Sequence, residues 1–230
     1  MRKMITKLSG KRKKKLEALL ISLGKSNLQQ TIIEPYKQKK WTIITDKQEY
    51  RKKDNVLPVY PGSMPKIFAE IAPELVRAFS SENMIVVDPG CGSGILGLSL
   101  AKEKKVKFAY EIDINSRALK MTQLNFLIQK VENKLKLIEK SYFEMNKNKE
   151  LINNVDILIS NPPFNPELPS LPWAIHSGGG NVTGTLHFEK QVEQLDRLLK
   201  DNGIAVFYML SLTHDSAGNH PYLVDILKEK

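Results

Sequence analysis

The stretch from Val86 to Gly97 constrains the fold more than any other part of the chain. It reads Val-Val-Asp-Pro-Gly-Cys-Gly-Ser-Gly-Ile-Leu-Gly, an apolar strand end followed by a glycine-rich turn and the start of a helix. Its four glycines let the backbone turn sharply and approach a ligand closely. The helix start offers unpaired N–H groups to a carboxylate or phosphate. We therefore expect a strand–turn–helix unit that binds a nucleotide-like cofactor.

Strand and helix patterns alternate regularly around this unit. We expect strands at 84–87, 106–112, 134–138, 155–160 and 204–210, and helices at 66–79 (interrupted around Pro73), 95–102, 116–130, 186–200 and 222–230. Such alternation predicts an α/β fold in which a mostly parallel, twisted sheet has helices on both faces. Ligands of these sheets bind at the carboxyl ends of the strands, where the glycine turn lies.

The N-terminal quarter of the chain carries the excess of positive charge. Residues 1–54 contain 16 Lys and Arg against 5 Asp and Glu, whereas the remainder contains 19 against 20. A run of five cations, Lys11 to Lys15, precedes leucines at helical spacing, and residues 41–45 resemble a short strand. We expect residues 1–54 to be a basic, partly helical extension that recruits an anionic macromolecule, most often a nucleic acid. A solvated tail that aids solubility is the alternative.

Composition excludes several classes of protein. No apolar run approaches the roughly 18 residues of a membrane-spanning helix, and we find no signal peptide. The single cysteine, Cys91, rules out a disulfide within the chain, and the four histidines lack the spacing of metal ligands. We expect a cytoplasmic protein without a metal site and without membrane contact. The sequence carries no signal for the oligomeric state.

Two cofactors fit the glycine turn. Residues 92–97 satisfy the pattern G-x-G-x-x-G, and acidic residues follow about 20 positions later, as in NAD-binding folds. Asp88 argues against NAD, because a carboxylate at the strand end suits a cationic part of a ligand, such as an amino acid ammonium group. Asp88-x-Gly90-x-Gly92-x-Gly94 resembles motif I of the class I S-adenosylmethionine-dependent methyltransferases. This resemblance implies a Rossmann-like fold and S-adenosylmethionine as the cofactor.

The same resemblance assigns further cofactor contacts. In the family an acidic residue at the end of the second strand binds the ribose hydroxyls, which implies Asp113 here, with Glu111 in reserve. Family members often place an acidic residue after the third strand, near the adenine amino group. This chain has Ser141 there, whose hydroxyl can accept a hydrogen bond. The neighbouring Tyr142 or Phe143 could pack on the adenine ring.

A second motif, Asn161-Pro162-Pro163-Phe164, follows the expected strand at 155–160. It resembles the [Asn/Asp/Ser]-Pro-Pro-[Tyr/Phe] motif of amino-group methyltransferases. The Asn161 side-chain carbonyl and the Pro162 backbone carbonyl can accept the two N–H hydrogens of a planar amino group. Two prolines stiffen the turn, and Phe164 offers a flat group a face on which to stack. The resemblance implies Asn161, Pro162 and Phe164 as the catalytic residues.

Residues 55–210 resemble the release-factor glutamine methyltransferases of HemK type and related small methyltransferase domains, and we assign residues 55–230 to the catalytic domain. The 20 residues after Leu210 are too few for the final helix and strand hairpin of the fold. The acceptor is a macromolecule, and two classes remain. The basic extension and Phe164 slightly favour a nucleic acid base such as adenine N6, in RNA or DNA. The proline connector at 56–61 favours a protein glutamine. A non-catalytic cofactor-binding module and an NAD-dependent dehydrogenase are two further hypotheses.

Overall fold

A computed structural model describes residues 10–36, 39–47, 54–167 and 177–209. Its centre is a sheet of five strands in the order β5-β4-β3-β6-β7, and every neighbouring pair is parallel. The strands are β3 (Met84–Pro89), β4 (Val106–Asp113), β5 (Leu135–Glu139), β6 (Val155–Ser160) and β7 (Leu199–Phe207). The predicted Rossmann-like α/β architecture is confirmed.

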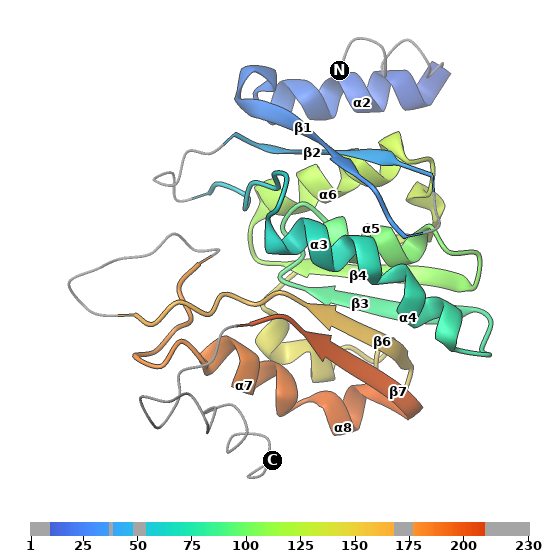
Figure 1. The fold of residues 1–230 in the computed structure, drawn as a ribbon, viewed down its shortest axis with the longest axis vertical. Coiled ribbons are helices and arrows are strands. Elements are labelled where there is room, and N and C mark those ends of the chain that lie inside the picture. Colours follow the sequence, from blue (N-terminus) through green and yellow to red (C-terminus); the bar gives the residue numbers. More distant parts are fainter. Residues whose placement is uncertain (1–9, 37–38, 48–53, 168–176, 210–230) are drawn as a thin grey trace.

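Helices cover both faces of the sheet, because the side chains of β3 alternate between two cores. Met84 and Val86 face a cluster that contains Leu98, whereas Ile85 and Val87 face a cluster that contains Leu198. The first face carries α3 (Met64–Ile71), α4 (Pro73–Ala78), α5 (Ile95–Ala101) and α6 (Ser116–Ile128). The second face carries η3 (Tyr142–Lys147), α7 (Leu186–Val192) and α8 (Leu195–Leu198), as Figure 1 shows.

The described part of the N-terminal segment is folded against the helices of the first face. It contains α2 (Gly10–Ser22), the short η1 (Lys25–Asn27) and an antiparallel pair, β1 (Leu28–Ile33) and β2 (Trp41–Asp46). Four leucines of this segment's helical stretch pack in one cluster with Met121, Leu124 and Leu127 of α6. In Figure 1 the layers from top to bottom are α2, the β1–β2 pair, the helices of the first face, the sheet and the helices of the second face.

Two sequence predictions about this fold were incomplete or wrong. β1 was not predicted, because its sequence Leu-Gln-Gln-Thr-Ile-Ile alternates poorly. The predicted helix at 186–200 is two helices, and β7 begins at Leu199 instead of 204. Residues 199–203, expected to end the helix and precede the strand, lie inside β7, where a register shift against β6 absorbs the extra residues. The predicted helix at 222–230 lies outside the described residues.

Candidate active site

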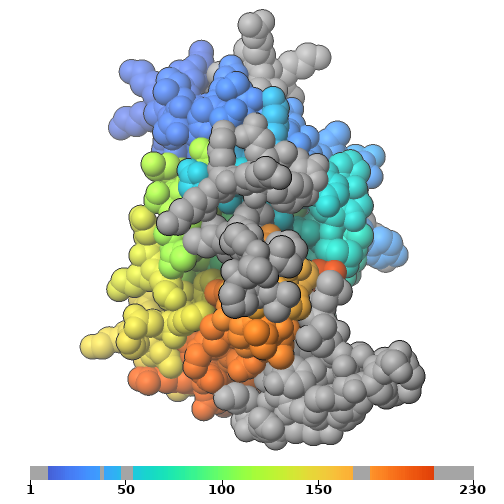
Figure 2. Space-filling model, turned by 90° about the vertical axis from the view of Figure 1, so that its left-hand side faces the viewer, coloured from blue at the N-terminus to red at the C-terminus, as the bar shows by residue number. Residues whose placement is uncertain are grey.

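A cavity of about 210 Å³ opens at the carboxyl ends of the sheet strands. The carboxyl ends face the viewer in Figure 2. The walls of this cavity come from the glycine turn after β3, the end of β4, the loop after β5, the end of β6 and the connector that follows the N-terminal segment. Seven residues predicted from the sequence line it: Asp88, Gly90, Gly92, Asp113, Ser141, Tyr142 and Asn161. Chain segments far apart in the sequence thus meet at one place.

The glycine turn has the backbone that its composition predicts. Gly90, Gly92 and Gly94 have φ of 75°, 54° and 71°, a region that side chains disfavour. A Cβ atom on Gly90 would lie 3.2 Å from the Tyr142 ring. Gly94 does not line the cavity; a Cβ atom there would lie 2.6 Å from Thr122 of α6. Gly90 and Gly92 therefore shape the cavity, and Gly94 allows α5 and α6 to pack.

Asp113 ends β4 and holds the glycine turn. Its Oδ2 accepts the N–H of Gly92 at 3.0 Å, and its Oδ1 accepts the N–H of Asn115 at 2.9 Å. Burial raises the pKa of Asp113 above its ordinary value. Each carboxylate oxygen has a second lone pair, so Asp113 can still accept hydrogen bonds from a pair of ligand hydroxyls.

Asp88 and Glu111 are opposite residues on β3 and β4 and are both buried. Asp88 Oδ2 accepts the N–H of Gly97 at the start of α5, at 3.1 Å. Burial raises the pKa of Asp88 to about 7, and burial beside Asp88 raises the pKa of Glu111 well above its ordinary value. Asp88 lines the cavity whereas Glu111 does not. Asp113 is therefore the better placed of the two acidic candidates on β4.

The loop after β5 supplies an aromatic wall. Ser141 caps η3 by accepting the N–H of Phe143 at 3.2 Å. The Tyr142 hydroxyl lies 2.6 Å from Nδ1 of His187, and the Phe143 ring centroid is 5.3 Å from that of His187. Burial lowers the pKa of His187, which favours its neutral form. No sequence pattern points to His187, because this residue starts α7 and reaches the cavity only through the tertiary fold.

Asn161 stands between this cavity and a second one of about 230 Å³. Both cavities are lined by Asn161 and Pro163, whereas Pro162 and Phe164 line only the second. The Asn161 Oδ1 atom is buried and has no hydrogen-bond partner among the described residues. A buried amide oxygen without a partner is costly, so this atom is well placed to accept a hydrogen bond from a ligand.

The second cavity is largely apolar and aromatic. Phe164 and Tyr208 meet edge to face, with ring centroids 5.9 Å apart. Tyr60 of the connector lies on the wall, as do prolines 58, 65, 162 and 163. No Lys, Arg, Asp or Glu is among its described lining residues. A flat, uncharged group suits such a cavity.

Comparisons with known proteins match this arrangement. Residues 72–176, slightly less than half of the chain, match the methyltransferase small domain family. This part of the chain is thus similar to that family. The fold is that of a solved structure, a SAM-dependent methyltransferase from Agrobacterium tumefaciens, with a TM-score of 0.51 at 14% identity over 75% of this chain and 51% of that one.

Two curated relatives have named acceptors. A release factor glutamine methyltransferase of Fusobacterium nucleatum is 28% identical over 158 residues, which are 64% of this chain and 42% of that protein. A ribosomal RNA large subunit methyltransferase G of Alteromonas mediterranea is 30% identical over 128 residues, 49% of this chain and 31% of that protein. The chain thus spans less than half of the length of either relative.

The methyltransferase small domain implies S-adenosylmethionine as the methyl donor, and the residues of the first cavity fit it. Asp113 can accept from the ribose hydroxyls, the aromatic wall of Tyr142 and Phe143 can pack on adenine, and the glycine turn leaves room for the methionine part. No group of His, Cys, Asp or Glu in the described ranges is arranged to hold a metal ion. Within the same ranges, no helix has both the length and the apolar character needed to cross a membrane.

Proposed function

We propose that the protein transfers a methyl group from S-adenosylmethionine to a planar amino nitrogen of a macromolecule. The observation that carries this proposal is the Asn161 Oδ1 atom, buried and unpartnered at the junction of the two cavities. The first cavity takes the methyl donor and the second takes the acceptor. When bound, the donor would supply an electrophilic methyl group. As the nitrogen–methyl bond forms, the sulfur–methyl bond would break to leave S-adenosylhomocysteine, and the amino nitrogen would lose one N–H proton to solvent.

The catalytic residues act by orientation. Asn161 Oδ1 and the Pro162 carbonyl accept the two N–H hydrogens of the acceptor and turn a nitrogen lone pair towards the first cavity. The prolines hold these acceptors in place, and Phe164 packs on the flat group. Fixed dipoles and a fixed geometry account for the rate, without a strong general base.

A nucleic acid base is the favoured acceptor. The aromatic lining of the second cavity from Tyr60, Phe164 and Tyr208 supports it, since bases stack on such rings. The five exposed cations at the start of α2 also support it. A protein glutamine is the second candidate, because the relative from Fusobacterium nucleatum is named for that acceptor.

The test compares Asn161→Ala with Asn133→Ala, the same change at an exposed residue of the short η2 (Glu132–Lys134). Asn161→Ala should lower transfer of a tritiated methyl group to a cell extract by a factor of about 100 or more. It should change the affinity for S-adenosylhomocysteine, measured by calorimetry, less than about threefold. Asn133→Ala should change neither quantity.

The outcomes separate the competing functions. Release of the label by nuclease identifies a nucleic acid acceptor, and release by protease identifies a protein. Loss of S-adenosylhomocysteine binding in Asn161→Ala would contradict the role given to Asn161. Binding by the wild type without transfer to any acceptor would support the non-catalytic module instead.

A further inference from the structure

Helix α6 binds the edge of β2 that β1 leaves open. Gln129 donates to the carbonyl of Thr42 at 2.7 Å. Asn125 accepts the N–H of Ile44 at 2.7 Å and donates to its carbonyl at 2.8 Å. Asn125 also donates to the carbonyl of Ser93 in the glycine turn, at 2.9 Å. Side chains of α6 therefore replace a third strand beside β2 and tie it to the cofactor turn.

Helix α6 also contacts the end of β2 through an ion pair between Arg117 and Asp46. Arg117 Nε donates to Asp46 Oδ2 at 2.9 Å, and Arg117 Nη2 donates to Asp46 Oδ1. Nη2 also donates to the carbonyl of Leu23, just beyond α2, at 2.9 Å. Asp46 is 2% exposed. A two-pronged pair with a buried carboxylate fixes geometry better than an exposed pair does.

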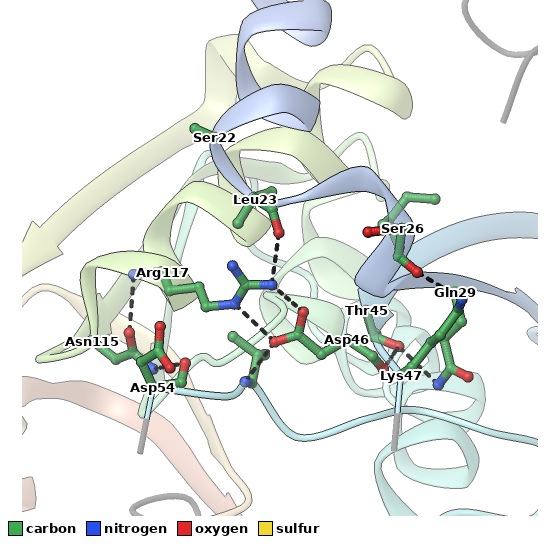
Figure 3. Close-up of polar contacts among 12 residues, drawn as sticks. Ser22, Leu23, Ser26, Gln29, Thr45, Asp46, Lys47, Asp54, Asn115 and Arg117 are labelled. Atoms are coloured by element: carbon green, nitrogen blue, oxygen red, sulfur yellow. Dashed lines mark hydrogen bonds and ion pairs between the residues drawn. The ribbon is translucent and has the colours of Figure 1, made fainter. Parts of the chain in front are cut away.

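Asp46, held in this way, also binds the backbone of the connector. Its Oδ2 accepts the N–H of Val56 at 3.0 Å. Figure 3 shows the bonds that the same carboxylate accepts from Arg117. Val56 lines the cofactor cavity with its neighbours Asn55 and Leu57. A Cβ atom on Gly92 would lie 3.6 Å from Val56 Cγ1, so Val56 packs beside the glycine turn.

The first turn of α6 holds the connector at a second point. Asn115 Nδ2 donates to the carbonyl of Asp54 at 2.9 Å, and the Asn115 N–H donates to Asp113. Asn115 Oδ1 in turn accepts the N–H of Arg117. The same short segment, 113–117, therefore carries the proposed ribose-binding carboxylate and both anchors of the opposite wall.

We propose that Arg117 is a positioning residue for the methyl donor: through Asp46 it holds residues 54–57 as one wall of the cofactor cavity. The proposal rests on the proposed function, which places S-adenosylmethionine in that cavity. Arg117 does not line the cavity; it acts through Asp46 and the Val56 amide. The N-terminal segment is thereby part of the machinery for cofactor affinity, whatever acceptor it recruits.

The test uses Arg117→Ala, Arg117→Lys and Asp46→Asn in the full chain, with Arg12→Ala as the matched control. Arg12 lies in the same N-terminal segment as Asp46, but its ion pair is with Glu132 of η2 and not with the connector. We expect Arg117→Ala to raise the Kd for S-adenosylhomocysteine roughly tenfold. Lysine keeps the charge but loses the fork of donors. Arg117→Lys should therefore fold, and its Kd for S-adenosylhomocysteine should lie between those of the wild type and Arg117→Ala. Arg12→Ala should keep the wild-type affinity.

A second measurement does not depend on the cofactor. Hydrogen–deuterium exchange of the 54–59 segment in the ligand-free protein should speed up in all three variants and stay unchanged in Arg12→Ala. Folded Arg117→Lys with wild-type affinity and wild-type exchange would overturn the proposal, and so would faster exchange with wild-type affinity. Failure of the wild type itself to bind S-adenosylhomocysteine would instead overturn the cofactor assignment.

Discussion

Two buried carboxyl groups, Asp88 and Glu111, lie opposite each other on the neighbouring strands β3 and β4. A Cβ atom on Gly97 would lie 1.8 Å from Glu111 Oε1, so only glycine leaves space for this side chain. Two buried carboxylates so close together cannot both ionise at low cost. Burial and the neighbouring Asp88 raise the pKa of Glu111 well above its ordinary value, and burial raises the pKa of Asp88 to about 7.

The raised pKa of Asp88 makes stability depend on pH. Its pKa is about 7 in the folded state against an ordinary value of 3.8, so the folded state binds the proton more tightly. The protonated Asp88 therefore stabilises the folded state fully below about pH 4, and this stabilisation is lost as pH rises to about 7. Over that range the free energy of unfolding falls by at most about 1.4 kcal/mol per pH unit for one proton. In Asp88→Asn we expect urea unfolding to show a free energy that rises relative to the wild type between pH 5 and 7.

The matched control for this prediction is Asp201→Asn, at an exposed carboxylate of β7. Its free energy of unfolding should follow the wild-type profile from pH 5 to 8. Parallel profiles for Asp88→Asn and the wild type would show that Asp88 is already ionised throughout this range.

At the residue scale, cavity-lining residues were predictable where a local motif presents them. Asp113 ends β4 and Asn161 follows β6, so each stands at the end of a strand in a regular βα pattern, within or beside a motif of its own. His187 and Val56 also line the cofactor cavity, but no motif surrounds them. His187 reaches the cavity from the start of α7, and Val56 is held beside it by a hydrogen bond to Asp46. Contacts of this kind depend on tertiary packing, which patterns in a single sequence do not encode.

At the scale of elements, α2 belongs to the core of the molecule. Leu16 is 1% exposed and packs with α6, whereas Ile21 on the same helix is 80% exposed. Leu16→Ala should lower the free energy of unfolding by about 2–5 kcal/mol through reduced burial and a residual cavity. Ile21→Ala should stay within about 0.5 kcal/mol of the wild type. Urea unfolding measures both; equal, small effects would mean that α2 does not contribute to the folded core.

The elements also show where sequence patterns fail. Strong apolar runs such as 84–87 and 155–160 predict β3 and β6 nearly to the residue. β1 is different, because Gln29, Gln30 and Thr31 are polar, and their strand is stabilised by pairing with β2 and by contacts to the Val59 carbonyl. β7 begins early, where Leu199 pairs with Val155 of β6 and Lys200 Nζ donates to Asp156. Partners distant in sequence decide both cases.

At the scale of the whole molecule, charge and chemistry lie at opposite ends of the sheet. Arg12 pairs with Glu132, just before the amino end of β5, whereas both cavities open at the carboxyl ends of the strands. A nucleic acid that contacts the cations of α2 and also presents a base to Asn161 must follow the side of the molecule (Figure 1). We therefore expect the basic helix to bind phosphates of such a nucleic acid and to make no contact at the proposed site of transfer.

This separation predicts the effect of removing charge from α2. Changing the exposed Lys11, Lys13, Lys14 and Lys15 together to Gln should weaken binding of a single-stranded RNA and flatten its dependence on salt, by about 0.7 in the slope of log K against log salt for each phosphate that the protein no longer neutralises. The affinity for S-adenosylhomocysteine should not change.

The control changes four exposed lysines elsewhere, Lys104, Lys107, Lys120 and Lys149, to Gln. Equal reductions of RNA affinity in the two variants would mean that net charge alone binds RNA, and an unchanged affinity in the α2 variant would remove the main support for a nucleic acid acceptor.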